Sequence, residues 1–338
     1  MAKHSPARPI TFGAPPVQIK FDLKDTLARM NFSPSLPLID EIQRKRGTRL
    51  FCLFLDPVVM LRPEMLDPIE AMVVRTGKVD KLDIFLRSSG GVAEVPWHVV
   101  STLREFCDRL GIIVSGRALS GATHIAISGD EIVMGPTARL GSVDPKRTHP
   151  LLPKDEHGNQ IPVSVEELKL CVEFIKQQLG ESYPNQNLAL IISELFKYIN
   201  PLALGAIEQS FNLSKLMTRK CLKSRKTPLE EEHIERVVEM LASKYYSHSF
   251  LISRSEVESD LNLPITKPDS ELLEAINRLH QFYVGQFQIE TPPDSQGVSH
   301  KLAGVLQYGS FGFGVVQVKH HNNPISDFYS PFDYGGNP

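Results

Sequence analysis

The sequence has few cysteines and almost no net charge, and both features exclude classes of protein. Its 338 residues include four cysteines, which lie far apart and form no metal-type Cys-x-x-Cys spacing. This usage fits buried free thiols in a reducing compartment. The 37 lysines and arginines nearly balance the 39 aspartates and glutamates. Bulk charge therefore does not favour nucleic acid or an anionic membrane as a partner.

Long apolar runs are also missing. No segment approaches the roughly 18–20 apolar residues that cross a bilayer, so we expect no transmembrane segment. Residues 1–16 are rich in proline and lack the apolar core of a signal peptide. With 41% hydrophobic and 22% charged residues, the composition is that of a globular protein. Together these features predict a cytoplasmic protein.

Between residues 50 and 136, short apolar runs alternate with helical periodicity. Continuous apolar runs of this length are typical of buried strands, and glycines that follow periodic segments are typical of helix ends. Short connections in a β-α-β order predict a parallel sheet with right-handed crossovers, which is an α/β fold. We expect strands at 50–56, 81–91, 112–119 and 131–136, and helices at 65–77, 92–111 and 120–129.

The pattern changes after residue 163, where long amphipathic stretches predict a helical region to about residue 247. A capping box at 253–261 and a helix at 270–287 follow, and alternation around glycines predicts a hairpin at 300–320. We expect the last dozen residues to form a flexible tail. The predicted organisation is an extended arm (1–20), an α/β core (21–163), a mainly helical C-terminal region (164–290), and a hairpin with a tail (291–338).

Two glycine-bearing turns follow predicted strands and carry the chemistry. The first is LRSSGGV (86–92), where paired glycines let the backbone approach a ligand closely. The second is RALSGATHIA (117–126), which places Ser120 where a strand becomes a helix. A serine beside exposed turn amides is the arrangement used for acyl transfer. Each turn also has a simpler explanation, because Ser120 is equally typical of a helix N-cap and Gly90-Gly91 of a tight turn.

Several segments in order resemble the serine dehydrogenase proteinase family, a branch of the ClpP/crotonase superfamily related to signal peptide peptidase A. They are GKVDKLDIFLRSSGG, RALSGATHIAISGDEIVMGPTARLGSVDP, INPLALGAIEQS and SHSFLISRSEVESDLNLPI. The resemblance covers roughly half of the chain. It implies a ClpP/crotonase-like parallel sheet with flanking helices.

The resemblance also implies roles for individual residues. Ser120 would be the nucleophile, and the amides of Gly91, Gly121 and, with them, Gly90 would form the oxyanion hole. Three positions depart from the family pattern. Ser89 replaces a proline, Ser120 is followed by Gly-Ala rather than Ala-Gly, and Leu119 stands where relatives often have lysine.

A serine nucleophile needs a base, and the histidines give several alternatives. The Clp protease pattern would place a histidine near residues 143–145, where this chain has Val-Asp-Pro. His248 matches a late histidine of the family. His124 shares a helical face with Ser120, but relatives carry an apolar residue there, so it is expected to face the core or an interface. His98 and His149 are expected to be packed or solvated.

Lysines are the other alternative, because Ser-Lys relatives place the lysine some 40–50 residues after the serine. Lys154 and Lys169 bracket this window and Lys146 lies nearer. A lysine acts as a base only where burial or a neighbouring cation lowers its pKa. We select Lys154 and His248 as the two candidates for the base.

These features predict a serine peptidase or related hydrolase that acts on a peptide or protein through a Ser120 acyl-enzyme. No metal or cofactor is implied, and the superfamily suggests a homo-oligomer with an interface built by residues 170–250. The alternative is a catalytically inactive peptide-binding or scaffolding protein of the same fold. A crotonase-like acyl-CoA enzyme is a third possibility, because a two-amide oxyanion hole also serves thioester enolates.

Overall fold

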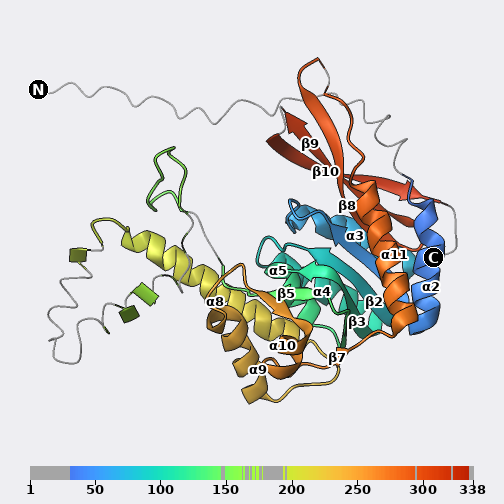
Figure 1. Ribbon diagram of the computed structural model, residues 1–338, viewed down its shortest axis with the longest axis horizontal. Coiled ribbons are helices and arrows are strands. Elements are labelled where there is room, and N and C mark those ends of the chain that lie inside the picture. The colour runs from blue at the N-terminus through green and yellow to red at the C-terminus, as the bar shows by residue number, and fades with distance from the viewer. Residues whose placement is uncertain are drawn as a thin grey trace, which may run out of the picture.

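Figure 1 shows the protein as a computed structural model. It describes residues 31–145, 149–161, 196–293, 295–320 and 323–334, together with isolated positions between 163 and 194. The predicted Lys146 and Lys169 lie outside the described residues.

The first half of the chain alternates strands and helices as the sequence predicts. Strands β1, β2, β3 and β4 lie side by side in that order, and each adjacent pair is parallel. The α/β class is therefore confirmed. The elements are β1 (Arg49–Leu55), α3 (Leu66–Thr76), β2 (Val79–Ser88), α4 (Val95–Glu105), β3 (Cys107–Ala118), α5 (Gly121–Ile127) and β4 (Glu131–Met134).

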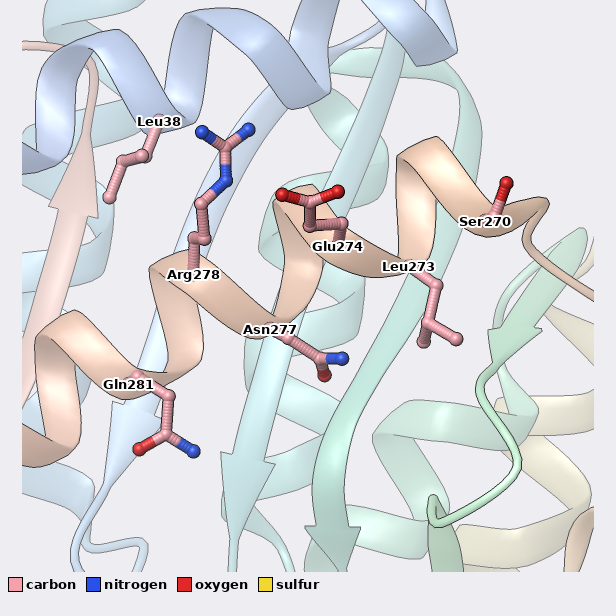
Figure 2. Close-up of a pocket in the computed structure, with 7 residues that line it drawn as sticks. All are labelled: Leu38, Ser270, Leu273, Glu274, Asn277, Arg278 and Gln281. Atoms are coloured by element: carbon pink, nitrogen blue, oxygen red, sulfur yellow. The ribbon is translucent and has the colours of Figure 1, made fainter.

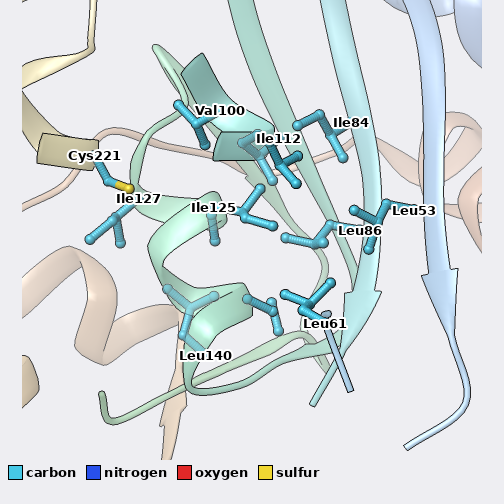
Figure 3. Packing of buried hydrophobic residues seen from close by; sticks show 14 of the residues in the cluster. Leu53, Leu61, Ile84, Leu86, Val100, Ile112, Ile125, Ile127, Leu140 and Cys221 are labelled. Carbon is cyan, nitrogen blue, oxygen red and sulfur yellow. The ribbon is translucent and has the colours of Figure 1, made fainter. Parts of the chain in front are cut away.

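Helices cover both faces of the sheet, which explains why its strands read as continuous apolar runs. In β1, Leu53 and Leu55 point to one face, while Cys52 and Phe54 point to the other. The first face packs against α3, α4 and α5. Figure 3 shows Val100 of α4 and Ile125 of α5 beside Ile84, Leu86 and Ile112 of the sheet. The second packs against α2 (Leu36–Arg46) and α11 (Ser270–Gln286), which lie next to each other in Figure 1.

A mainly helical region follows the core, as predicted. Helix α8 (Pro201–Lys223) packs on α5 and α4, and α9 (Glu231–Glu239) packs on α8 (Figure 1). Helix α10 (Arg254–Ser259) begins with the predicted capping box, formed by Ser253 and Glu256. Short strands tie this region back to the sheet. They are β5 (Arg139–Gly141), which pairs with β3, β6 (Leu251–Ser253), which pairs with β5, and β7 (Ile265–Thr266), which pairs with β4.

The C-terminal segment extends the sheet on the side of β1. The predicted hairpin is present as β8 (Val298–Tyr308) and β9 (Phe311–His320), with β8 antiparallel to β1. The flexible tail is partly wrong, because β10 (Asn323–Asp333) pairs antiparallel with β9 over nearly its whole length. Strand β9 supplies the pairing partner of β10. The local sequence of β10, which contains two prolines, does not by itself predict a strand.

The helix predicted at 92–111 is too long. Helix α4 ends at Glu105, and β3 begins at Cys107, opposite Val79 of β2. Gly111 is therefore a strand residue and not a helix cap. A Cβ there would lie 2.1 Å from Oδ1 of Asp83, so only glycine lets β3 pass this buried carboxylate.

Candidate active site

Ser120 occupies a strained turn between β3 and α5. Its φ of 48° and ψ of −119° lie where L-residues are rare, and holding such a conformation costs on the order of 1–3 kcal/mol. The side chain does not cap α5, although Ser120 stands at the N-cap position. The N-cap explanation is therefore wrong. A serine held on a sharp strand-to-helix turn is the geometry of a nucleophile elbow.

The Gly90-Gly91 turn, which follows β2, packs directly against Ser120. A Cβ on Gly90 would lie 2.6 Å from the amide nitrogen of Gly121 and 2.9 Å from Cβ of Ser120. The φ of Gly90 is +90°, which also requires glycine. The two turns are thus in van der Waals contact, and the Ser120 turn leaves no room for a Cβ on Gly90.

Leu61 holds this turn from the opposite side, through its main chain. Its N–H donates to the Gly90 carbonyl (2.8 Å), and its carbonyl accepts from the N–H of Val92 (2.9 Å). A Cβ on Gly91 would lie 2.2 Å from the Leu61 carbonyl oxygen. Within the turn, Gly90 N–H donates to Oγ of Ser88 (3.0 Å). Sequence reasoning missed Leu61, because a main-chain contact leaves no signature in residue type.

Two N–H groups at this contact have no partner among the described residues. They belong to Gly91 and Gly121, and neither donates a hydrogen bond within that part of the chain. A Cβ on Gly121 would lie 3.3 Å from the Gly91 nitrogen, so the two residues are close neighbours. Paired free donors beside a serine can stabilise the oxyanion of an acyl-transfer reaction. The structure therefore brings together Ser120, Gly90, Gly91 and Gly121.

The two candidates for the base lie in different surroundings. His248 is half-buried, and its Nδ1 bonds the main-chain carbonyl of Asp144, which orients the ring and leaves Nε2 as the acceptor. Its segment is tied to β5 by a hydrogen bond from Ser142 Oγ to the Ser247 carbonyl (2.9 Å). Lys154 is exposed in a loop that projects from the body of the molecule (Figure 1). Neither forms a hydrogen bond with Ser120 among the described contacts.

The other histidines have structural positions. His124 is buried between α5 and α8, and its Nε2 bonds Oγ1 of Thr218 (3.0 Å). Burial lowers its pKa to about 4, an effect only partly offset by a hydrogen bond to the Ser214 backbone. His98 is exposed on α4, and His149 caps its own loop by accepting from the N–H of Leu151.

Asp130, which lies between α5 and β4, has a structural role. It forms an ion pair with Arg104 (2.6 Å) and accepts from the N–H groups of Leu110 (2.9 Å) and Lys226 (2.6 Å). These bonds outweigh burial and hold the pKa of its carboxyl below the usual value. The ion pair joins α4, β3 and the end of α8 behind the site.

A groove of about 640 Å³ runs along the outer side of α11, on the sheet face opposite to α5 (Figure 2). Leu38 and Arg278 face each other across its end, and Arg278 is already paired with Glu41 of α2. It holds none of the serine and glycine residues described above. Within the described residues, no cluster of three or more metal-ligating side chains occurs, and no helix is long and apolar enough to span a bilayer.

Comparisons with known proteins give distant matches. No protein-family model matches the chain. The uncharacterized protein MJ1495 of Methanocaldococcus jannaschii is 25% identical over 52% of this chain and 68% of its own length. The uncharacterized protein MJ0137 of the same organism is 32% identical over 22% of this chain and 26% of its own length.

Solved structures are also similar at low identity. A mutant of the 1510-N membrane-bound stomatin-specific protease, in complex with a substrate peptide, is 13% identical with a TM-score of 0.37, over 68% of this chain and 80% of that one. A ClpP1 mutant from Listeria monocytogenes is 12% identical with a TM-score of 0.37, over 71% of this chain and 99% of that one.

Proposed function

We propose that this protein is a serine hydrolase of the peptidase type, which acts on a peptide or protein through an acyl-enzyme at Ser120. The observation that carries the proposal is the strained Ser120, whose side chain does not cap α5, beside two N–H groups that have no partner among the described residues. The resemblance of its motifs to the serine dehydrogenase proteinase family supports the same reading.

In the proposed reaction, Oγ of Ser120 attacks the carbonyl carbon of the scissile amide, and its proton passes to the base. The N–H groups of Gly91 and Gly121 stabilise the negative charge on the former carbonyl oxygen. The C–N bond then breaks, and the amine leaves with the proton from the base. Water, activated by the same base, attacks the ester and releases the acid and free Ser120.

We propose His248 as this base in preference to Lys154. Its Nδ1 bond to the Asp144 carbonyl fixes the tautomer that leaves Nε2 free to accept a proton. Strand β5 connects its segment to the end of β3 that precedes Ser120. Catalytic hydrogen bonds are often long before substrate binds, so the reaction requires this side of the site to close on Ser120.

The second candidate function is a peptide-binding or scaffolding protein without catalysis. It is favoured by one observation, which is that Ser120 Oγ forms no hydrogen bond with a titratable side chain among the described residues. In either case a homo-oligomer remains a prediction. The exposed apolar residues Phe196 and Tyr198, just before α8, and Leu202, in its first turn, are consistent with an interface there.

Labelling with a fluorophosphonate probe tests the proposal. Intact mass spectrometry should show one adduct on the wild type and none on Ser120→Ala. Both proteins are first shown to be folded, and their oligomeric mass in solution is measured. Ser128→Ala is the control, because Ser128 lies at the opposite end of α5 from Ser120 and its hydroxyl donates to the Ile125 carbonyl (2.7 Å). A wild type that is folded and stays unlabelled, although its site admits a peptide, would favour the binding function.

A further inference from the structure

A bulge in β3 opens a cavity beside the candidate active site. Leu86 of β2 pairs with Val114 of β3, but the next paired residues are Ser88 and Ala118. Arg87 alone therefore faces three residues, 115–117. Gly116 in this bulge has a φ of +88°, and a Cβ there would lie 3.1 Å from Cε1 of His280. Bulges of this kind re-aim side chains and are frequent next to active sites.

The resulting cavity has a volume of about 310 Å³ and adjoins both catalytic turns. Ser89 and Leu119, which immediately precede Gly90 and Ser120, belong to its wall. This volume is at the lower end of small-molecule sites, which span roughly 300–1,000 Å³, and suits one residue of a peptide better than a long segment. Its described lining also includes Arg87, Arg117 and His280.

The cavity carries positive charge that no described carboxylate neutralises by an ion pair. Arg87 rests on the Phe54 ring at 5.0 Å, and its Nη1 is buried without a hydrogen-bond partner in the described part of the chain. Burial and the charge of Arg117 lower its pKa. The carboxylate of Asp56 has the opposite effect and raises the pKa of Arg87. Asp56 has other partners, however, because it accepts a hydrogen bond from the N–H of Val58 (3.1 Å) and lies 3.7 Å from Nζ of Lys301.

His280 gives the cavity a fixed wall rather than a second strong charge. Its Nδ1 bonds Oγ of Ser115 (2.8 Å), and its ring meets Phe54 edge-on. Burial and the nearby Arg87 both lower the pKa of His280, so the ring is neutral at pH 7. The two guanidinium groups remain as the groups that attract a ligand. A buried donor on a cation is costly to leave unpaired, and a carboxylate satisfies it by a charge-assisted bond.

We propose that this cavity is a carboxylate-binding subsite, in which Arg87 and Arg117 hold one carboxylate of a peptide whose scissile bond lies at Ser120. The carboxylate belongs to the C-terminus of the peptide or to an Asp or Glu side chain. The position of the scissile bond rests on the proposed function. The binding of the carboxylate itself does not, and it is measurable in a protein without Ser120.

Fluorescence anisotropy with Ser120→Ala protein tests the subsite without turnover. Three random hexapeptide pools carry a neutral fluorophore at the N-terminus and contain no acidic residue except where stated. The first ends in a free carboxylate, the second in a carboxamide, and the third in a carboxamide with one glutamate. We expect the first or the third pool to bind at least tenfold more tightly than the second, and the difference between those two identifies the source of the carboxylate. Equal binding of all three pools would overturn the proposal.

Substitutions then assign the preference to the two arginines. Arg87→Gln and Arg117→Gln should each reduce the preference for the carboxylate-bearing pool roughly tenfold or more, as expected for a charge-assisted bond. Arg117 is exposed, so its variant tests the site even where Arg87→Gln does not fold. Arg109→Gln is the matched control, an exposed arginine of β3 away from the cavity. A preference that survives Arg117→Gln and Arg87→Gln contradicts the assignment.

The fluorophosphonate result separates this proposal from the proposed function. Labelling of Ser120 without a carboxylate preference leaves the hydrolase and removes the subsite. A carboxylate preference without labelling leaves the subsite and makes the chain a peptide-binding protein.

Discussion

The nucleophile side and the base side of the candidate site are built in different ways. On the nucleophile side, the turns at Gly90-Gly91 and Ser120 are locked by main-chain contacts with each other and with Leu61. On the base side, His248 is held by one bond to a carbonyl, and Lys154 lies in an exposed loop. The comparison teaches that the placement of the Gly91 and Gly121 N–H groups beside Ser120 is a property of the sheet and its turns. The base depends on how distant segments fold over the sheet.

The largest expected effect is a difference between the two candidate bases. His248→Ala should slow fluorophosphonate labelling of Ser120 by roughly 100–10,000-fold, the usual range for a general base. Lys154→Ala should change it by less than about threefold, because Lys154 is exposed in a loop and forms no hydrogen bond with Ser120 among the described contacts. Labelling reactions quenched at a series of times, with the adduct measured by intact mass spectrometry, give both rates.

His98→Ala is the control for that comparison, because His98 is exposed on α4. The opposite ranking, with Lys154→Ala slower than His248→Ala, would mean that the 150–161 loop folds over Ser120 in the working enzyme. The base side would then be completed by a movement that this structure does not show.

A second prediction concerns the rigidity of the nucleophile side. Gly91→Ala should slow labelling by roughly 100–1,000-fold, the usual cost of losing one oxyanion donor, because a Cβ there meets the Leu61 carbonyl at 2.2 Å and must displace the turn. Gly205→Ala in α8 is the matched control. Nothing lies within 4 Å of a Cβ at that position, so the same change in a helix should stabilise the protein by about 0.5–1 kcal/mol.

Thermal unfolding accompanies the rate measurements for both glycine variants. A Gly91→Ala protein that is folded and is labelled at the rate of the wild type would contradict this prediction. It would show that the Gly90-Gly91 turn is an ordinary packed turn, and that its N–H groups are not part of the site.

The difference between local and long-range contacts also explains which elements the sequence could predict. Strands β1 to β4, the Gly-Gly turn and the Ser253 capping box depend on patterns within ten or so residues, and all were expected. The start of β3 at Cys107 and the strand β10 depend on pairing with a neighbouring strand, which overrides local periodicity. The bulge at Gly116 is equally hidden. His280 lies against Gly116 there, and the chain brings this histidine to the bulge only through the packing of α11 on the sheet.

The smallest expected effect is pH-dependent and tests how firmly α5 carries the nucleophile. Burial lowers the pKa of His124 to about 4, from 6.5 in an unfolded chain. Between these two values the unfolded state binds a proton that the folded state excludes, so stability falls as the pH drops from 6.5 to 4. The pKa difference corresponds to at most about 3 kcal/mol.

His124→Leu should remove this loss, because leucine has no proton to gain. Thr218 keeps its bond to the Ser214 carbonyl (2.9 Å) in that variant, so no buried hydroxyl is left unpaired and stability at pH 7 should change little. Urea unfolding at pH 7 and pH 4.5 measures the effect, with His98→Gln as the exposed control. Equal losses in the wild type and in His124→Leu would show that the acid sensitivity lies elsewhere. The contact of α5 with α8 would then be independent of the histidine beside the nucleophile.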